Sequence, residues 1–263
     1  MADLARETYE VYAIRYATRE GRRAGSFLEE DSHDGPMGMD YFVWVVRNAL
    51  RTIVVDTGFD ETVGRRRGRT FLRCPAESMR LLGIAPEEVQ DVVLTHLHND
   101  HAGNLDKFPN ALFHLQDSEM TFATGRYMRH SCCGRAYELD HVIETLKLNY
   151  AGRIEFHDGA EEIADGVTLH PAGGHTSGLQ FVRVHTRAGW LVLASDASHF
   201  YENVQRNNPY RLVFHVGRAL DGFRAMCRLA DDERLIVPGH DPLVMTRFPA
   251  PRPELDGIVV RLD

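Results

Sequence analysis

The stretch Thr95-His96-Leu97-His98-Asn99-Asp100-His101-Ala102-Gly103 follows the apolar run Val92-Val93-Leu94 and places three imidazoles and one carboxylate within six residues. Histidine nitrogen combined with carboxylate oxygen is the ligand set of catalytic zinc sites. Side chains alternate along an extended segment, so His96 and His98 point the same way and can share one ion. If the chain then turns into a helix, Asp100 and His101 face the other side and can hold a second ion. The segment therefore predicts a metal site after a buried strand.

Two ions need more ligands than these four neighbouring side chains can supply. Three further candidates, His175, Asp196 and His240, each follow an apolar run of the chain. Each lies where a short buried strand gives way to a loop rich in Gly, Pro or Ser, the usual position of catalytic residues on a rigid scaffold. Together with the first segment they complete two coordination shells.

The motif His96-x-His98-x-Asp100-His101, followed in order by the three distant candidates, resembles the metallo-β-lactamase superfamily. Upstream, Val54-Val55-Asp56-Thr57-Gly58 resembles the first motif of that superfamily, a strand ending in Asp at a tight turn. The match runs from about Phe42 to His240. Within the superfamily the chain looks most like the N-acyl-homoserine lactonase group, because of Gly174-His175-Thr176, Asp196-Ala197-Ser198 and Pro238-Gly239-His240.

The resemblance implies an α/β (α+β) fold, the αββα sandwich, in which two mixed sheets lie between helices and the metals sit at one sheet edge. It also implies a role for each ligand: the first metal would be held by His96, His98 and His175, the second by Asp100, His101 and His240, with Asp196 bridging the two. Asp56 is expected to orient a ligand imidazole through its free N–H. A turn-capping role for Asp56 is the alternative.

By the same resemblance the protein is expected to be a hydrolase with two divalent metal ions. Zn²⁺ is the default for these ligands, with Mn²⁺, Fe²⁺ or Co²⁺ as alternatives. Ions about 3.5–4 Å apart can trap a bridging hydroxide at neutral pH. That hydroxide would attack the ring carbonyl of an N-acyl-homoserine lactone or related small lactone, a quorum-quenching reaction, while Asp100 carries the proton to the leaving alkoxide. A homodimer is common among relatives.

One position departs from the family. Many homoserine lactonases carry a Tyr three residues after the bridging Asp, where this chain has His199. A neutral imidazole can donate the same hydrogen bond to the substrate carbonyl, and an imidazolium can donate a stronger one. His199 is therefore a candidate catalytic residue, and Tyr201 is the alternative source of the hydroxyl.

Other functions of the same fold are the alternatives to lactone hydrolysis. Thioester hydrolysis of the glyoxalase II type is the hardest to separate, because its metal ligands can be the same. β-Lactam hydrolysis, phosphodiester cleavage and sulfur oxidation at one iron fit less well: Asp196 stands where one large β-lactamase group has Cys, no basic patch stands out, and a full second ligand set is present. A non-catalytic, metal-stabilised binding protein would be expected to have lost ligands, and none is lost.

Composition agrees with one enzymatic domain over residues 1–263. The chain of 263 residues is 43% hydrophobic and carries a net charge of −8, which favours neither nucleic acid nor an anionic membrane as a partner. The N-terminus has no apolar segment of the signal-peptide type, and no stretch reaches membrane-spanning length. The four cysteines, which include adjacent Cys132-Cys133, do not resemble a secreted disulfide framework. We therefore expect a cytoplasmic protein with reduced thiols, although the even count leaves a bridge open.

The remaining pattern predicts a coarse order of elements. Residues 1–39 contain a strand at Val11–Ile14 and a covering loop, and strands at Tyr41–Val46 and Thr52–Val55 form a hairpin. Helices are expected at Ala76–Leu82, after Pro86, at Gln116–Thr124, at Leu139–Leu148 and at Leu220–Leu229, the last preceding the final core strand. Residues 116–150 form a helical segment near the active site, with 125–135 less regular. The run Arg65-Arg66-Arg67-Gly68-Arg69 is interpreted as a solvated loop rather than a site for an acidic substrate.

Overall fold

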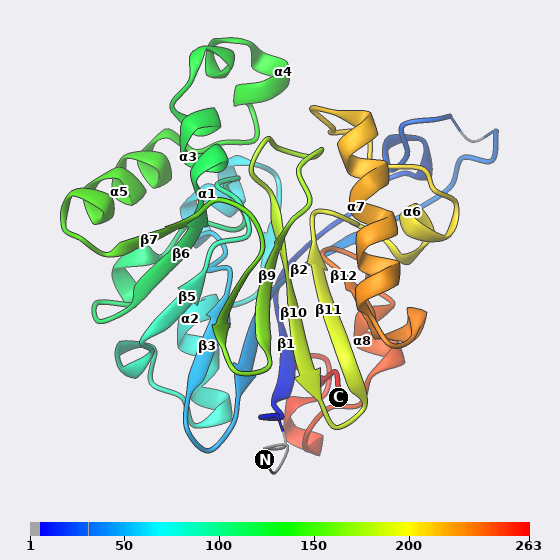
Figure 1. The fold of residues 1–263 in the computed structure, drawn as a ribbon. Coiled ribbons are helices and arrows are strands. Elements are labelled where there is room, and N and C mark those ends of the chain that lie inside the picture. The colour runs from blue at the N-terminus through cyan, green and yellow to red at the C-terminus, as the bar shows by residue number, and fades with distance from the viewer. Residues whose placement is uncertain (1–5, 31) are drawn as a thin grey trace.

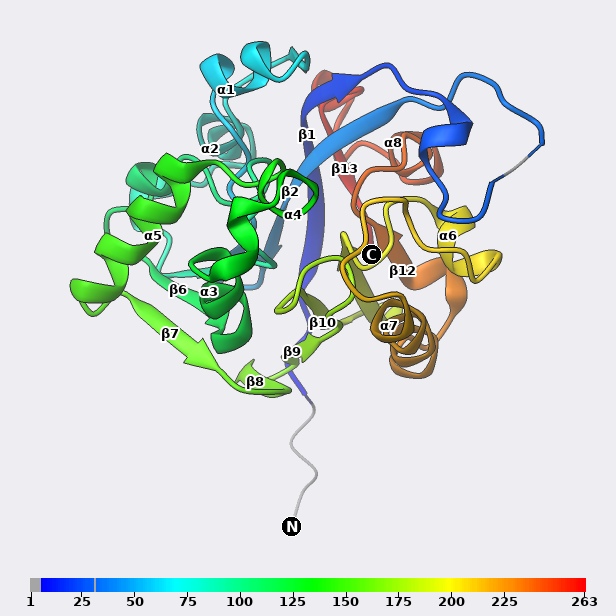
Figure 2. The ribbon, with the colours of Figure 1, turned by 90° about the horizontal axis from the view of Figure 1, so that it is seen from above.

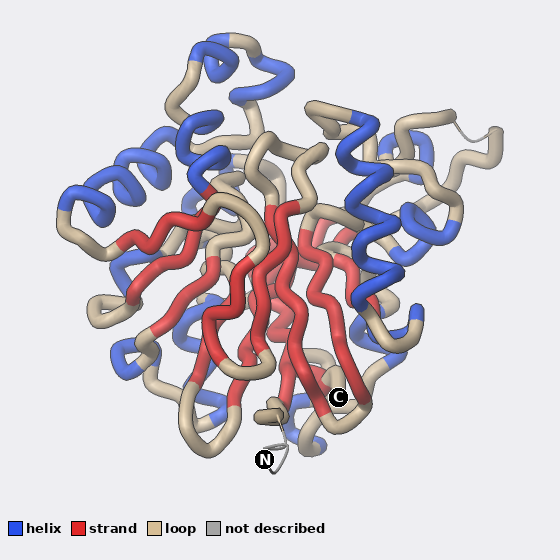
Figure 3. The backbone as a smooth tube through the Cα atoms, viewed as in Figure 1, coloured by secondary structure: helices blue, strands red, loops and turns tan. Residues whose placement is uncertain are grey.

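The computed structural model of the protein describes residues 6–30 and 32–263. Two β-sheets lie face to face, and helices cover the outer side of each (Figures 1 and 3). This arrangement is the αββα sandwich that the resemblance implied.

Within the described residues the first sheet has eight strands and the second has five. The first contains β1 (Glu10–Arg19), β2 (Met39–Arg47), β3 (Thr52–Val55), β4 (Thr70–Phe71), β5 (Asp91–Val93), β6 (Leu112–Gln116), β7 (Ile154–His157) and β13 (Val259–Arg261). The second contains β8 (Glu161–Ala164), β9 (Val167–Pro171), β10 (Gln180–Thr186), β11 (Gly189–Ser195) and β12 (Ile236–Pro238).

The strand order is β13-β1-β2-β3-β5-β6-β7 in the first sheet, with β4 paired to β1, and β12-β11-β10-β9-β8 in the second. Strands β1 to β3 are antiparallel, whereas β3, β5, β6 and β7 are parallel. In the second sheet only the β11–β12 pair is parallel. Both sheets are therefore mixed, as expected.

The helices divide between the two outer faces (Figure 2). On the side of the first sheet lie α1 (Glu61–Arg66), α2 (Pro75–Ser78), α3 (Asp117–Ala123), α4 (Ser131–Gly134) and α5 (Leu139–Tyr150). On the other side lie α6 (Tyr201–Gln205) and α7 (Val216–Leu229), whereas α8 (Val244–Arg247) lies beside β13 and packs its Val244 against the cluster between the sheets. In the described part of the chain, no helix is long and apolar enough to span a bilayer.

Alternation along the strands creates three apolar layers. In β2, Trp44 points into the cluster between the two sheets, whereas Val43 points into the cluster under the helices of the first sheet. In β11, Leu193 faces the cluster between the sheets and Val192 packs with Phe223 of α7. Strands that are buried on both faces read as continuous apolar runs, which explains why Val92-Val93-Leu94 marks a central strand.

Several predicted elements are confirmed. The hairpin is formed by β2 and β3, whose register pairs Val45 with Val54. The expected helices at Gln116–Thr124, Leu139–Leu148 and Leu220–Leu229 correspond to α3, α5 and α7. The loop between β1 and β2 lies against the region of α6, where the Leu28 amide donates to the Pro209 carbonyl at 2.8 Å (Figure 2).

Other predicted elements are wrong or incomplete. The expected helix after Pro86 is a single 3₁₀ turn, Pro86–Glu88, because the chain enters β5 three residues later. The expected helix at Ala76–Leu82 is the short α2 followed by a 3₁₀ turn that ends at Gly83, which adopts the left-handed conformation (φ 74°). The irregular 125–135 region contains a 3₁₀ turn and α4.

The strand after α7 is not the last one. β13 follows it, at Val259–Arg261, and pairs antiparallel with β1 at the edge of the first sheet. A three-residue strand has too little periodicity to be recognised, and its conformation depends on the partner strand that it extends.

Candidate metal centre

The seven predicted ligands meet at one edge of the sandwich, although they come from four separate segments. The His96–His101 segment follows β5, His175 lies in the loop after β9, Asp196 follows β11 and His240 follows β12. Six of the seven are buried, and Asp100 has a side chain that is 17% exposed. The structure therefore brings together every residue that the sequence proposed as a ligand.

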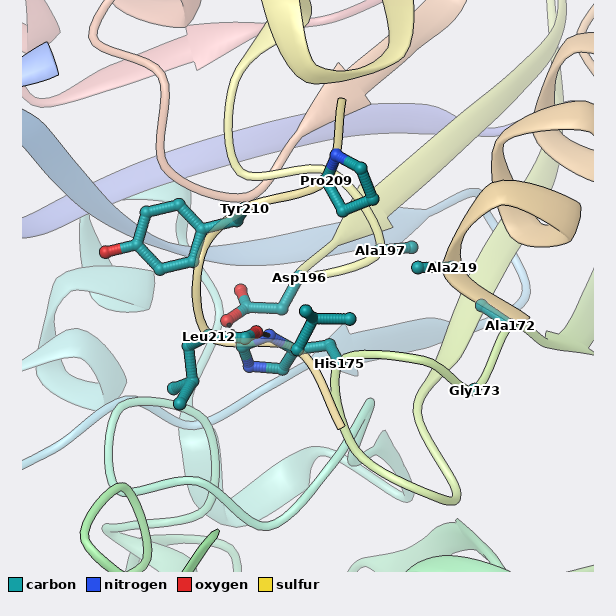
Figure 4. Close-up of a pocket in the computed structure, with 10 residues that line it drawn as sticks. Ala172, Gly173, His175, Asp196, Ala197, Pro209, Tyr210, Leu212 and Ala219 are labelled. Carbon is teal, nitrogen blue, oxygen red and sulfur yellow. Dashed lines mark hydrogen bonds and ion pairs between the residues drawn. The ribbon is translucent and has the colours of Figure 1, made fainter. Parts of the chain in front are cut away.

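Asp196 lies between two groups of imidazoles. Its Oδ2 atom is 3.1 Å from Nε2 of His175 and 3.8 Å from Nε2 of His96. Its Oδ1 atom is 2.9 Å from Nε2 of His240 and 3.2 Å from Nε2 of His101. Figure 4 shows the Asp196 carboxylate next to the His175 ring, with Tyr210 and Leu212 beside them. The two oxygens thus face different imidazole pairs, which is the geometry of a bridging carboxylate.

Two sets of ligand atoms are each compact enough to surround one ion, with all atoms of a set within 4.8 Å of one another. The sets are His96, His98, His175 and Asp196, and Asp100, His101 and His240. They coincide with the two ligand sets that the resemblance implied. A third combination, Asp196 with His199 and His240, also meets this distance.

The outer nitrogens of the imidazoles are held by hydrogen bonds, which aim the inner nitrogens at the centre. Nδ1 of His175 lies 2.7 Å from the Leu212 carbonyl, and Nδ1 of His240 lies 2.9 Å from the Asp40 carbonyl. A ring that donates through Nδ1 keeps the lone pair of Nε2 free for a metal. The backbone thereby selects the tautomer that binds an ion.

Asp56 performs this task for His101 with a carboxylate. Its Oδ2 lies 2.7 Å from Nδ1 of His101, and it also accepts from the Thr95 hydroxyl at 2.9 Å. Oδ1 of Asp56 accepts from the Thr95 amide at 2.8 Å. The fully buried Asp56 therefore ties the end of β3 to the ligand segment after β5, in the position expected for an orienting carboxylate.

Unpartnered polar atoms at the centre fit a pair of cations. Nε2 of His96 and of His101 and Oδ1 of Asp196 are buried, and their close approaches to one another and to His240 lack hydrogen-bond geometry, so none has a hydrogen-bond partner among the described residues. Buried polar atoms are nearly always satisfied, so atoms without a partner that converge on one point indicate a missing group. Burial holds the pKa of His96 and of His98 well below the ordinary value, so both are neutral, the state that binds a metal.

The carboxylates affect His101 in the opposite direction. Burial lowers its pKa, but the nearby charges of Asp196, Asp56 and Asp100 outweigh burial and leave the pKa well above the ordinary value. Burial raises the pKa of Asp196, but the surrounding imidazoles, His199 first among them, bring it well below the ordinary value. The protein alone therefore attracts a proton to this centre, and a divalent cation would take the place of that proton.

The backbone leaves the strands abruptly where these side chains are presented. Asp56 (φ 60°) and Ser195 (φ 46°) adopt the left-handed conformation, which is rare for residues other than glycine. A Cβ atom on Gly239 would lie 2.7 Å from the Ser195 carbonyl carbon and oxygen, so only glycine allows the chain after β12 to approach the end of β11 this closely. These turns bring Asp196 and His240 together.

Glu119, in the first turn of α3, is a positioning residue that the sequence did not reveal. Its buried carboxylate accepts hydrogen bonds from the Leu97 amide (3.1 Å) and the Tyr137 hydroxyl (2.8 Å) through Oε1, and from the Thr176 hydroxyl (2.6 Å) and the Gly178 amide (3.1 Å) through Oε2. It therefore connects the His96–His98 segment to the loop that carries His175. An acidic residue in the first turn of a helix is ordinary, so nothing in the sequence distinguishes it.

His199 lies at the centre and lines the cavity, and its role as a hydrogen-bond donor to substrate stays a prediction. Its Nε2 lies 3.1 Å from Oδ2 of Asp196, and burial lowers its pKa to about 3. The lowered pKa favours the neutral imidazole over the imidazolium at neutral pH. Its other face stacks on Tyr210, with ring centroids 3.7 Å apart and an interplanar angle of 11°.

Tyr201, the alternative source of a hydroxyl, does not line the cavity at the centre. Its ring lies under the Arg247 guanidinium, 3.8 Å away, in the apolar layer between the sheets. Tyr210 does line the cavity, and its hydroxyl is 3.4 Å from the Arg19 guanidinium. The side chain that stacks on His199 therefore presents a hydroxyl near the cavity wall, and the spacing from Asp196 gave no sign of it.

A cavity of about 380 Å³ opens above the predicted ligands. Four arginines line it: Arg19, Arg67, Arg69 and Arg135. The interpretation of the 65–69 run as a solvated loop is wrong for half of its members. Arg65 and Arg66 lie exposed on α1, but Arg67 and Arg69 turn inward to the cavity, because α1 ends at Arg66 and the chain must return to β4.

All four cysteines have free thiols, and the sulfur atoms of Cys132 and Cys133 are 3.8 Å apart. The described part of the chain therefore contains no disulfide bond.

The chain is similar in sequence to known proteins. The family model described as the metallo-beta-lactamase superfamily matches residues 38–240. An N-acyl homoserine lactonase from Bacillus sp is 28% identical over 221 residues, 77% of this chain and 82% of the relative. N-acyl homoserine lactonase AiiB from Agrobacterium fabrum is 32% identical over 174 residues, 58% of this chain and 60% of the relative.

Solved structures share the fold at lower identity. An N-acyl homoserine lactone hydrolase with the product N-hexanoyl-L-homoserine bound at its catalytic metal centre superposes with a TM-score of 0.76 at 21% identity, covering 92% of this chain and 97% of that one. AidC, a dizinc quorum-quenching lactonase, gives a TM-score of 0.67 at 17% identity, covering 91% of this chain and 90% of the other.

Proposed function

The chain belongs to the metallo-β-lactamase superfamily, and from that premise we propose that it is a metal-dependent hydrolase that opens lactone rings. The curated relatives of both organisms named above are N-acyl homoserine lactonases. We propose that residues 1–263 act as a single domain of this kind. The observation that carries the proposal is the position of Asp196, whose two oxygens face separate imidazole pairs at the floor of a cavity of about 380 Å³.

In this proposal two divalent ions bind the chain, one to His96, His98 and His175 and one to Asp100, His101 and His240, with Asp196 shared. Zinc is the metal we favour, because imidazole and carboxylate suit it and because a similar structure is a dizinc lactonase. When bound, such ions supply a water-derived nucleophile at neutral pH and polarise an ester carbonyl. The buried, unpartnered Nε2 atoms of His96 and His101 support this ligand assignment.

Asp100 is the residue we assign to proton transfer. Its side chain is the only partly exposed member of the predicted ligand set, and it lines the cavity. The Tyr16 hydroxyl donates to the Asp100 backbone carbonyl at 2.8 Å, which holds the residue at the cavity floor. One carboxylate oxygen can therefore take a proton from the attacking water and deliver it to the ring oxygen as the C–O bond breaks.

Tyr210 is the residue we assign to orienting the substrate carbonyl. Its ring is held by stacking on His199, which is itself held by Asp196. A phenol hydroxyl fixed in this way can donate a hydrogen bond to the carbonyl oxygen as negative charge develops on it. His199 then acts as a positioning residue that sets the plane of the Tyr210 ring.

The test is hydrolysis of a panel of lactones, followed by proton release, with metal content measured on the same sample. The panel contains short and long N-acyl-homoserine lactones, γ-butyrolactone and an aromatic lactone, with a glutathione thioester as the comparison substrate. We expect about two metals per chain and lactone opening that is abolished in Asp100→Asn and His101→Ala.

Turnover of the thioester without turnover of any lactone would replace the lactonase assignment by the glyoxalase II type. One iron per chain without hydrolysis of any substrate would overturn the hydrolase assignment itself.

A further inference from the structure

The charged groups around the cavity are almost all positive. Apart from Asp100, Asp196 and the histidines at the centre, every acidic or basic side chain lining the cavity in the described part of the chain is an arginine: Arg19, Arg67, Arg69 or Arg135. The chain as a whole has a net charge of −8. A local excess of arginine against that background indicates a recognition site for negative charge.

One of the four is neutralised within the protein. Arg67 lies 3.2 Å from the Glu138 carboxylate and donates to the carbonyls of Arg135 and Tyr137, each at 2.8 Å. It therefore braces the cavity wall and keeps no free donor pair for a ligand.

Arg19 and Arg69 have no carboxylate partner among the described residues. Arg19 reaches only the Met39 sulfur (2.6 Å) and the Tyr210 hydroxyl (3.4 Å) with its guanidinium. Arg69 donates only to the Arg67 carbonyl (2.8 Å) and lies over the Tyr41 ring at 5.6 Å. Nε of both arginines is buried without a hydrogen-bond partner.

The fold brings these two residues to the same cavity on neighbouring segments. β1 and β4 pair antiparallel with Thr18 opposite Thr70, and Arg19 and Arg69 are the next residues of the two segments beyond that pair. Partly buried guanidinium groups without a counter-ion lose hydration. Both groups therefore keep donors available for an anion, and planar guanidinium groups match the oxygens of a carboxylate or a phosphate.

We propose that the natural substrate is a lactone that carries an anionic oxygen group, a carboxylate or a phosphate, bound by Arg19 and Arg69 while the ring carbonyl faces the metal centre. This inference rests on the proposed lactonase function and narrows its substrate class. A lactone with only a neutral substituent leaves both guanidinium groups unpaired. The negative group stays intact, so the reaction remains the addition of water across the ring ester.

Substrates with the same lactone ring and different substituents separate the effect of a negative charge on kcat/KM from the effect of the ring. γ-Butyrolactone is the neutral member, 5-oxotetrahydrofuran-2-carboxylate adds a carboxylate to the same ring, and the phosphate ester of 5-(hydroxymethyl)-γ-butyrolactone adds a phosphate. We expect kcat/KM to be at least tenfold higher for one anionic lactone than for γ-butyrolactone, and the advantage to shrink as salt is added. The preferred anion identifies which of the two groups is recognised.

Variants test whether these arginines cause the preference. Arg69→Gln and Arg19→Gln should each lower the ratio of anionic to neutral kcat/KM about 10- to 100-fold, the effect of losing a charge-assisted hydrogen bond or two. Arg69→Lys keeps the charge without the planar pair of donors, so its ratio of anionic to neutral kcat/KM should lie between those of the parent and Arg69→Gln. Arg65→Gln is the matched control, because Arg65 lies outward on α1 with a side chain that is 80% exposed.

A binding measurement gives a readout that does not depend on turnover. Pyroglutamate and 2-pyrrolidinone are the non-hydrolysed lactam counterparts of the acidic and neutral lactones, and calorimetry should detect binding of pyroglutamate that weakens in Arg69→Gln. Equal kcat/KM for neutral and anionic lactones, or a preference that survives in both glutamine variants, would overturn the inference and leave the lactonase function standing. If no lactone is opened but pyroglutamate binds through Arg69, the anion site stands and the proposed reaction fails.

Discussion

Replacing Glu119 by Gln tests how the His96–His98 segment is held against the loop that carries His175. The carboxylate accepts four hydrogen bonds, from Leu97 and Tyr137 through one oxygen and from Thr176 and Gly178 through the other. Gln keeps the size of the side chain but presents an amide NH₂ on one side. The Thr176 hydroxyl can rotate to accept from that group, whereas the Gly178 amide cannot.

The expected loss of stability comes from the Gly178 amide, a buried donor that would face the NH₂ group of the new side chain. An unsatisfied buried N–H costs about 1–3 kcal/mol, and the remaining bonds lose their charge assistance. Because burial raises the pKa of Glu119, a neutral side chain recovers part of the desolvation cost, so we expect a net loss of about 2 kcal/mol. For a chain of this size that is a decrease in Tm of about 4–8 °C.

Urea unfolding and metal affinity together check this reasoning. Leu97 lies between two predicted ligands and Thr176 is next to a third, so we expect the affinity for the first metal to fall about 10- to 100-fold. The matched control is Glu77→Gln, whose exposed side chain pairs with Arg80 and whose loss should cost at most about 0.5 kcal/mol. If Glu119→Gln unfolds within about 0.5 kcal/mol of the parent and keeps its metal affinity, the clamp assigned to Glu119 does not exist.

Four further outcomes are expected. Asp56→Asn should weaken metal binding about 10- to 100-fold in a chelator competition, because Nδ1 of His101 loses its carboxylate. Removing metal with EDTA should lower Tm by on the order of 10 °C, since metal at about 1,000 times its Kd contributes about 4 kcal/mol; an unchanged melting curve would contradict the assigned centre. Tyr210→Phe should reduce kcat for lactones about tenfold or more with normal metal content. Because the raised pKa of Glu119 means that the folded state binds its proton more tightly than the unfolded chain, stability should fall as pH rises from the ordinary carboxyl range through the folded pKa, and Glu119→Gln should lack this slope in urea titrations.

Structural elements that depend on residues close together in the chain could be predicted from the sequence. The ligand segment after β5, the β2–β3 hairpin and helices α3, α5 and α7 all carry a local period or motif that survives in any context. Short elements could not be read in this way. β13 has three residues, and the turn after Pro86 continues into a strand because β5 must pair with β3 and β6.

The residues that line the cavity illustrate the same limit. Tyr210 lines the cavity from a loop that has no motif, and its ring stacks on His199. The run from Arg65 to Arg69 looks uniform in the sequence. In the structure Arg65 is exposed on α1, whereas Arg69, in the segment that returns to β4, lines the cavity.

The amino-acid sequence by itself predicted the seven ligands, because a metal-binding motif requires particular donor atoms at particular spacings after a strand, and the resemblance of that motif to a known superfamily implied the layered architecture. Only the tertiary structure decided how those donors are oriented, which carboxylate clamps them and which side chains face the cavity. Glu119, Tyr210 and Arg19 lie near the centre through contacts between segments far apart in the chain, and contacts of that kind leave no periodic trace in the sequence.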